Sequence, residues 1–181
     1  MPRTEDPAQM SSEPLPTFKY HLDPVKTGSV KRGPAGCVCC GRARGYIYAG
    51  PVYAREEYDE SICPWCIADG TAHERLGASF ADTEGIGGHG AWDDVPMSVI
   101  QEVAQRTPGF NGCQQEQWWT HCDDAAQFIG RAGKKEIEAV DPQAKAVIRE
   151  SIGLGDGPAW NEFLAALDKD GSPTAYMFRC I

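Results

Sequence analysis

Four cysteines in two pairs carry the clearest chemistry in this chain. Cys37 and Cys40 are separated by two residues, and so are Cys63 and Cys66. A gap of two residues lets a tight turn direct two thiolates at one ion, and two such turns supply the four sulfur ligands of a closed tetrahedral zinc site. The spacing therefore predicts a structural zinc ion bound by Cys37, Cys40, Cys63 and Cys66.

Other interpretations of these cysteines stay open. Cys39 lies beside Cys40 and could replace it as the partner of Cys37. The thiols could instead be buried without a metal, or the sequence CPWC at residues 63–66 could open a helix as a redox-active dithiol. A thioredoxin-like dithiol should follow a core strand in a βαβ unit, without a second CxxC pair nearby. This chain lacks that context, so we favour zinc.

A second group of metal-ligand residue types lies far from these pairs in the sequence. His121 and Cys122 are adjacent, and Cys180 is the penultimate residue. Together they could supply part of a second metal site, although no complete ligand set is evident. We expect Cys113 to be a buried apolar thiol.

Short strands and a helix are expected to position the first cysteine set. Residues 44–54 (RGYIYAGPVYA) are rich in aromatic and β-branched residues and predict two short strands around Gly50-Pro51. Residues 66–77 predict a short helix that the second cysteine pair opens. A cysteine turn before a hairpin, followed by a pair at a helix start, is typical of a treble-clef-like zinc module over about residues 34–78.

The C-terminal half is predicted to be helical over about residues 93–170. Asp94 is the expected N-cap of a helix over residues 96–106. Residues 114–129 predict another helix because their apolar positions recur at spacings of three and four. That apolar face comprises Trp118, Cys122, Ala125, Ala126 and Ile129.

Three further elements are expected toward the C-terminus. Residues 134–152 predict a helical stretch interrupted at Asp141-Pro142, where the aspartate caps a new start, and residues 158–167 predict an amphipathic helix. Residues 174–181 predict a strand. The fold class is therefore α+β, with a flexible leader over residues 1–15 and a single domain over residues 16–181.

The composition limits the class of protein. The chain has 181 residues, of which 41% are apolar, and that is enough for a compact domain. No run approaches the roughly 18 apolar residues of a membrane helix, and the N-terminal stretch lacks the apolar core of a secretory signal. We expect a cytoplasmic protein, whose thiols stay reduced and bind metal rather than form disulfides.

The charge is acidic but uneven. The net charge is -9, yet residues 19–55 contain seven basic residues and one acidic residue. The simplest explanation is two differently solvated faces. The functional alternative is a basic anion-binding patch beside a large acidic surface.

Several stretches together resemble one family. They are YHLDPVKTGSV (20–30), CVCCGRARGYIYAGPVYA (37–54), CPWCIADGTA (63–72), RTPGFNGCQQEQWWTHCDDAAQFIG (106–130) and TAYMFRC (174–180). Over about residues 16–180 the chain is similar to the CbrC family of small bacterial proteins. The resemblance implies a cytoplasmic protein with a cysteine-bound zinc, in which Cys37, Cys40, Cys63 and Cys66 match the family's paired cysteines. It also implies an association with tolerance to a nuclease colicin. No catalytic residues are established for the family, so the resemblance transfers none to this chain.

Two departures from the CbrC pattern bear on the second cysteine group. Family members often continue past FRC with a further cysteine, whereas this chain has only Ile181 after Cys180. Many also carry another cysteine where this chain has Ala125-Ala126. Both departures weaken the case for a second metal site.

Binding functions fit these features better than catalysis does. An acidic protein can be steered onto a basic nuclease toxin, and Asp93, Asp94, Asp123 and Asp124 are the candidate contacts, unless they are helix caps or solvated carboxylates. The alternative is a nucleic-acid-binding zinc module. It would use Lys31, Arg32, Arg42 and Arg44, with Tyr46, Tyr48 and Tyr53 stacking on bases or packing in the hairpin core.

An enzyme is the least favoured class. Four thiolates leave zinc no open position for a substrate, which catalytic zinc needs. His121 with Asp123 or Asp124 could form an acid–base set, but helix neighbours of this kind are usually structural. We therefore expect no enzymatic activity.

Overall fold

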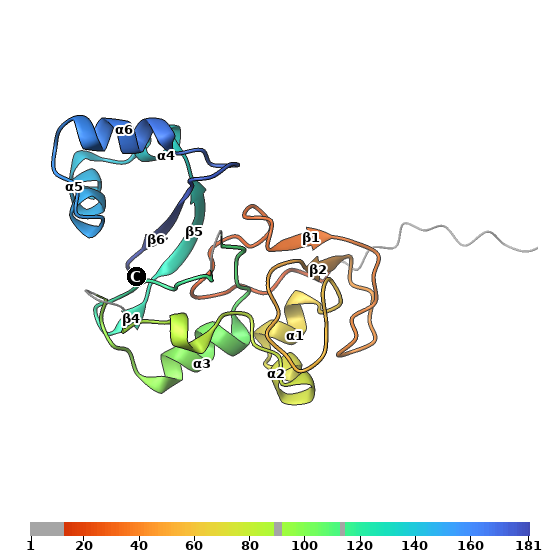
Figure 1. The fold of residues 1–181 in the computed structure, drawn as a ribbon. Coiled ribbons are helices and arrows are strands. Elements are labelled where there is room, and N and C mark those ends of the chain that lie inside the picture. Colours follow the sequence, from red (N-terminus) through yellow and green to blue (C-terminus); the bar gives the residue numbers. More distant parts are fainter. Residues whose placement is uncertain (1–12, 89–91, 113–114) are drawn as a thin grey trace, which may run out of the picture. The chain divides into compact units, whose positions relative to one another are not determined.

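A computed structural model describes residues 13–88, 92–112 and 115–181 (Figure 1). Its elements in chain order are β1 (Val30–Arg32), β2 (Tyr46–Tyr48), α1 (Pro64–Ala68), α2 (Thr71–Leu76), the 3-10 helix η1 (Thr83–Gly85), α3 (Met97–Arg106), β3 (Thr120–His121), β4 (Asp124–Ala125), β5 (Gln127–Ala132), α4 (Lys134–Ala139), α5 (Pro142–Ser151), α6 (Pro158–Ala166) and β6 (Ala175–Arg179). This mixture confirms the α+β class. Most of the predicted leader and Cys113, predicted as a buried thiol, lie outside the described residues.

The chain divides into two compact units. The first contains the described residues up to Gln127 together with Cys180 and Ile181, and the second spans Phe128–Arg179. Both cysteine groups thus belong to the first unit. None of the helices in the described part of the chain has the length and apolar character needed to cross a membrane.

The first unit contains the two-stranded antiparallel sheet β1-β2, in which Val30 pairs with Tyr48 and Arg32 with Tyr46. The predicted hairpin around Gly50-Pro51 is therefore wrong, because the partner of β2 precedes it in the chain. Beyond Pro51, Tyr53 forms only an isolated bridge with Ser79. The backbone N–H of Tyr48 donates to the carbonyl of Ile62, so the segment around Ile62 already occupies the edge of β2 that faces away from β1.

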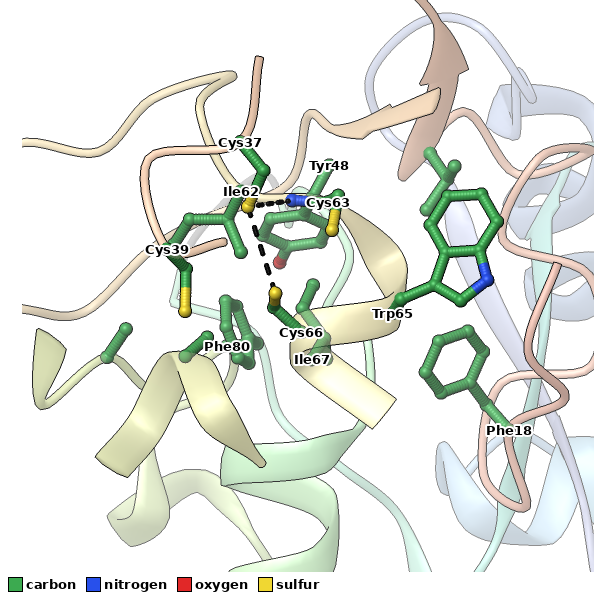
Figure 2. Close-up of a cluster of buried hydrophobic side chains, with 13 residues drawn as sticks. Phe18, Cys37, Cys39, Tyr48, Ile62, Cys63, Trp65, Cys66, Ile67 and Phe80 are labelled. Carbon is green, nitrogen blue, oxygen red and sulfur yellow. Dashed lines mark hydrogen bonds between the residues drawn. The ribbon is translucent and has the colours of Figure 1, made fainter. Parts of the chain in front are cut away.

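A buried cluster of apolar side chains lies around this sheet and α1. It includes Phe18, Val30, Tyr48, Ile62, Trp65, Ile67 and Phe80, together with four cysteines, Cys37, Cys39, Cys63 and Cys66 (Figure 2). The ring of Tyr48 meets that of Phe80 edge-on, with centroids 5.2 Å apart. The cysteine turns are therefore built into the hydrophobic core of the first unit.

Two predicted helix boundaries in the first unit need correction. The helix expected over residues 66–77 is broken into α1 and α2 at Gly70, whose φ of 82° lies in the left-handed region. Helix α3 begins at Met97 with Pro96 as its N-cap, so Asp94 is not the cap. Because proline fixes φ but not ψ, Pro96 takes an extended ψ of 147° and stays outside the helix.

The helix predicted over residues 114–129 is wrong. The described part of this segment forms β3, β4 and the start of β5, with Thr120 paired to Ala125 and His121 to Asp124. The indole N–H of Trp118 donates to the carbonyl of Ala126 at 2.8 Å. The apolar spacing misled here because Cys122, which completes the apparent helical face, lies exposed in the two-residue turn between β3 and β4. The aromatic and β-branched residues before the turn favour strand.

In the second unit β5 pairs with β6, and the helices α4, α5 and α6 follow one another in the chain between these two strands (Figure 1). Helix α4 packs against α6. The core of this unit contains Ala132, Ile137, Trp160, Leu164 and Leu167. Asp141 caps α5 by accepting backbone N–H groups of Gln143 and Ala144 at 2.9 Å, which confirms the predicted helix start. The predicted terminal strand is confirmed as β6.

Candidate metal centre

The sulfur atoms of Cys37, Cys40, Cys63 and Cys66 converge on one point. All four lie within 4.8 Å of one another. The sulfurs of Cys37 and Cys66 are 3.9 Å apart, and those of Cys40 and Cys63 are also 3.9 Å apart. A zinc ion with Zn–S bonds of about 2.3 Å requires sulfur separations of about 3.8 Å in a tetrahedron. The four thiols thus have the spacing of a metal tetrahedron, far beyond the length of a disulfide.

Two backbone turns hold these sulfurs in place. In the first turn the N–H of Gly41 donates to the carbonyl of Cys37 at 2.7 Å, and the φ of Gly41 is 71°. In the second, Cys63 is the N-cap of α1 with Pro64 in the first helical turn. The N–H of Val38 donates to the carbonyl of Ser61 at 2.8 Å, which ties the two turns together. Local backbone geometry therefore sets the spacing of the sulfurs.

Burial and hydrogen bonding divide the protons unevenly among these thiols. The sulfur of Cys37 accepts a hydrogen bond from the thiol of Cys63 and others from backbone N–H groups, including that of Cys63 at 3.3 Å. These hydrogen bonds lower the pKa of Cys37 to about 4. The bond between the two thiols raises the pKa of Cys63, and burial raises that of Cys66. Figure 2 shows the sulfur of Cys37 facing the Cys63 backbone nitrogen and the Cys66 sulfur. A divalent cation would replace the remaining protons and neutralise the crowded thiolates.

Cys39 lies in the same turn but outside the set of four. The converging group contains Cys40. The side chain of Cys39 is buried in the core, and its carbonyl accepts a hydrogen bond from the guanidinium of Arg75 at 2.9 Å. Burial also raises the pKa of its thiol. Of the two pairings that the sequence left open, the geometry matches Cys37 with Cys40.

The second group that the sequence suggested also converges. His121, Cys122 and Cys180 place one donor atom each within 4.8 Å of the others, and all three residues are exposed. His121 ends β3, Cys122 opens the turn to β4, and Cys180 follows β6. The structure thus brings together residues that are 58 positions apart in the sequence.

The four candidate aspartates have different surroundings. Asp124 is largely occupied within the chain, accepting from Lys19 and from the hydroxyl of Tyr20 at 2.7 Å each. Asp93 accepts the N–H of Cys122 at 2.9 Å. Asp94 and Asp123 are exposed. The aspartates most open to a partner are therefore Asp94 and Asp123.

The tyrosines considered for base stacking also differ. Tyr48 is buried, with its hydroxyl donating to the carbonyl of Pro51 at 2.8 Å, so it is a core residue. Tyr46 is half-buried against Trp65. The hydroxyl of Tyr53 donates to the buried carboxylate of Glu116 at 2.7 Å. Sequence reasoning did not single out Glu116, because an isolated glutamate in a polar stretch carries no pattern.

The fold and the site define a small α+β protein with a cluster of four cysteines, three of them buried, that is able to hold a metal ion. A family model described as "Uncharacterised protein family (UPF0167)" matches residues 15–181, and the chain belongs to this family. UPF0167 proteins of Mycobacterium bovis and Mycobacterium tuberculosis are each 47% identical to it, covering 97% of this chain and 93% of theirs. One from Pseudomonas aeruginosa is 40% identical, covering 93% and 92%. No solved structure matches the chain.

Proposed function

We propose that this protein is a non-catalytic binding protein whose first unit is held together by a structural zinc ion. The observation that carries the proposal is the convergence of four cysteine sulfurs, three from residues buried in the hydrophobic core and one from Cys40, which packs against it. Four thiolates complete the tetrahedral coordination of zinc, so no position remains for a substrate or an activated water. This ligand count supports a structural role for this metal ion and argues against catalysis at this centre.

Zinc is the ion that fits these donors best. Thiolate ligands select soft or borderline metals, and a tetrahedral set of four sulfurs is typical of zinc or an iron–sulfur centre. The turn at Cys37–Cys40 and the pair at the start of α1 support a treble-clef-like arrangement around that ion. We place the protein in the cytoplasm, where thiols remain reduced and available to the metal.

Replacing one ligand tests this assignment. We expect Cys63→Ser to lose one zinc equivalent per chain, measured by native mass spectrometry, and to melt at a clearly lower temperature. Structural zinc contributes directly to folding free energy, and the variant leaves Cys37, Cys40 and Cys66, two of them buried, without their cation. Retention of the full zinc content and an unchanged melting temperature would contradict the proposal.

The control is a cysteine in the same turn that is not a ligand. Cys39→Ser replaces the sulfur of a buried thiol by oxygen, as Cys63→Ser does. It therefore measures how much stability this replacement costs when no metal ligand is lost. We expect this variant to keep the zinc equivalent that Cys63→Ser loses. If the two variants lost zinc alike, the ligand set would not be the one assigned. A redox dithiol would instead appear as an oxidised CPWC pair with no bound metal.

We further propose that the partner is a basic protein such as a nuclease toxin, in line with the colicin tolerance implied by the CbrC resemblance. Residues 56–127 contain fourteen acidic residues and two basic ones. Nuclease toxins present basic surfaces that contact phosphate, and such surfaces attract acidic proteins. We expect a purified nuclease toxin domain to form a complex at low ionic strength that weakens as salt is added.

A nucleic-acid role has weaker support. Arg32 and Arg42 are exposed near the first cysteine turn, but Lys31 pairs with Glu60, and Arg44 is mostly covered and lies over the ring of Trp65. Tyr48 is buried and cannot stack on a base. We therefore treat nucleic-acid binding as the alternative, to be tested under the same low-salt conditions with single-stranded and duplex nucleic acid in place of the toxin domain.

A further inference from the structure

Three side-chain donor atoms, from His121, Cys122 and Cys180, lie close together on the surface of the first unit. The Nδ1 atom of His121 lies 2.8 Å from the sulfur of Cys122 and 3.6 Å from that of Cys180. The two sulfurs are 3.8 Å apart. The sulfur–sulfur separation equals the edge of about 3.8 Å that a zinc tetrahedron requires, and the nitrogen–sulfur separation of 3.6 Å is close to it. The separation of 2.8 Å between His121 and Cys122 is that of a hydrogen bond, so these two donors would have to move apart around an ion.

The backbone holds one of these donors, Cys122, and its neighbour Asp123 in an uncommon conformation. Cys122 and Asp123 both have a φ of 58°, the left-handed region, in the two-residue turn between β3 and β4. Such hairpin turns normally take Asn-Gly or Asp-Gly, because left-handed φ values are costly for other residues. The carboxylate of Asp93 accepts the N–H of Cys122 at 2.9 Å and supports the turn. Strained residues of this kind concentrate at binding sites.

The imidazole of His121 is also held by its surroundings. The ring of Trp119 stacks on it, with centroids 5.4 Å apart and planes inclined by 23°. Stacking limits rotation of the ring, so its Nδ1 atom faces the two sulfurs. Cys180 reaches this place because the chain returns to the first unit after β6. Two separate parts of the first unit therefore supply one donor set.

We propose that His121, Cys122 and Cys180 form a second metal site for a divalent cation of the zinc class. One imidazole and two thiolates are a donor set that binds zinc, and three protein ligands leave a fourth position for water. No fourth histidine, cysteine or carboxylate joins the three among residues 13–88, 92–112 and 115–181. Binding displaces one proton from each thiol and leaves the site neutral, since two thiolates balance the dication.

The site differs from the buried cluster in one testable respect. Its three residues are exposed, whereas the cluster of four cysteines belongs to the hydrophobic core. A chelator should therefore remove the ion of this site before it removes the ion of the four-cysteine cluster. Loss of this exposed ion should leave the folded core intact. This inference does not rest on the proposed function, because the two sites use different ligands.

Metal counting on the full-length chain tests the inference. We expect the protein, saturated with zinc and freed of excess, to carry two zinc ions per chain by native mass spectrometry. Cys180→Ser should carry one and should melt much closer to wild type than Cys63→Ser does, because Cys180 is exposed and outside the hydrophobic core. The matched control is Asp123→Asn, a neighbour in the same turn that is not a donor, which should keep both ions. Cys63→Ser should lose the other ion and melt at a lower temperature.

A wild-type chain that binds one zinc, with no change on Cys180→Ser, would overturn the site. A Cys122–Cys180 disulfide would overturn it too, and it would appear as a loss of two hydrogen masses together with resistance of both thiols to alkylation. Cobalt gives a second measurement of the wild-type protein. Two cobalt equivalents, one with a spectrum sensitive to added imidazole, would support an accessible ion beside a closed four-sulfur centre.

Discussion

His21 is a histidine whose ionisation is controlled by burial. Its side chain is fully covered, and its two ring nitrogens contact the carbonyl of Pro108 at 2.6 Å and the hydroxyl of Thr27 at 2.7 Å. A carbonyl can only accept, so Nδ1 carries the proton and Nε2 accepts from Thr27 in the neutral ring. Burial lowers the pKa of His21 to about 4, against about 6.5 in an unfolded chain.

This pKa shift predicts a dependence of stability on pH. As pH falls below about 6.5, the unfolded chain binds a proton at His21 that the folded chain rejects until about pH 4. The stability due to neutral His21 is therefore complete above pH 6.5 and is lost between these two values. From about pH 7 to about pH 5, we expect wild type to lose roughly 2 kcal/mol more unfolding free energy than His21→Gln. Denaturant unfolding at each pH measures this difference.

The comparison between the two proteins removes the contribution of the metal centre, whose thiols also take up protons in acid. Both should be measured with saturating zinc. Parallel losses of stability in wild type and His21→Gln would show that His21 titrates normally, against the burial argument.

The segment that follows α3 closes the core of the first unit. Residues 107–110 are all buried, and the N–H of Gly109 donates to the hydroxyl of Tyr48 at 3.1 Å. A Cβ atom on Gly109 would lie 1.8 Å from the carbonyl oxygen of Phe80. The segment fits against β2 and Phe80 only because residue 109 has no side chain.

This close approach predicts that Gly109→Ala is strongly destabilising. The new methyl group would meet rigid backbone rather than a movable side chain, so we expect a loss of about 3 kcal/mol of unfolding free energy. Thermal or denaturant unfolding measures it. The matched control is Gly36→Ala in the same unit, where the nearest atom to a Cβ would be 4.0 Å away. Equal stability of the two variants would contradict the packing argument.

The charge of the whole chain is distributed unevenly along the sequence. The chain carries a net charge of -9, whereas residues 56–127 alone have a net charge of -12. Several of these carboxylates serve the fold, among them Asp124 and Glu116, but Asp94 and Asp123 remain exposed. An acidic field of this size favours encounter with basic proteins and disfavours nucleic acid.

The charge distribution predicts a salt-sensitive complex with a basic nuclease toxin domain. We expect its association rate to fall about tenfold or more between low and physiological salt, measured by surface plasmon resonance. The double variant Asp94→Asn with Asp123→Asn should bind more weakly, while Asp156→Asn in the second unit should match wild type. Absence of a complex at low salt would remove the toxin proposal, and tight binding to single-stranded or duplex nucleic acid would favour the alternative.

Several features could be predicted from the sequence because they depend only on residues a few positions apart. The CxxC pairs predicted the converging set of Cys37, Cys40, Cys63 and Cys66, because two tight turns fix where sulfur atoms point. Asp141-Pro142 likewise predicted the start of α5, since a cap and a first-turn proline act within a few residues. The α+β class followed from the same local patterns.

Other features depend on contacts between residues that are far apart in the sequence. The partner of β2 is β1, because strand pairing depends on which other segments of the protein lie beside the strand. Residues 120–125 form a hairpin that was predicted as helix, because apolar spacing cannot distinguish a tight turn from a helix. The choice of Cys40 over Cys39 depended on which sulfur faced the second turn. The meeting of Cys180 with His121 and Cys122 required the chain to return after the whole of the second unit, and no local pattern in the sequence predicts where that return ends.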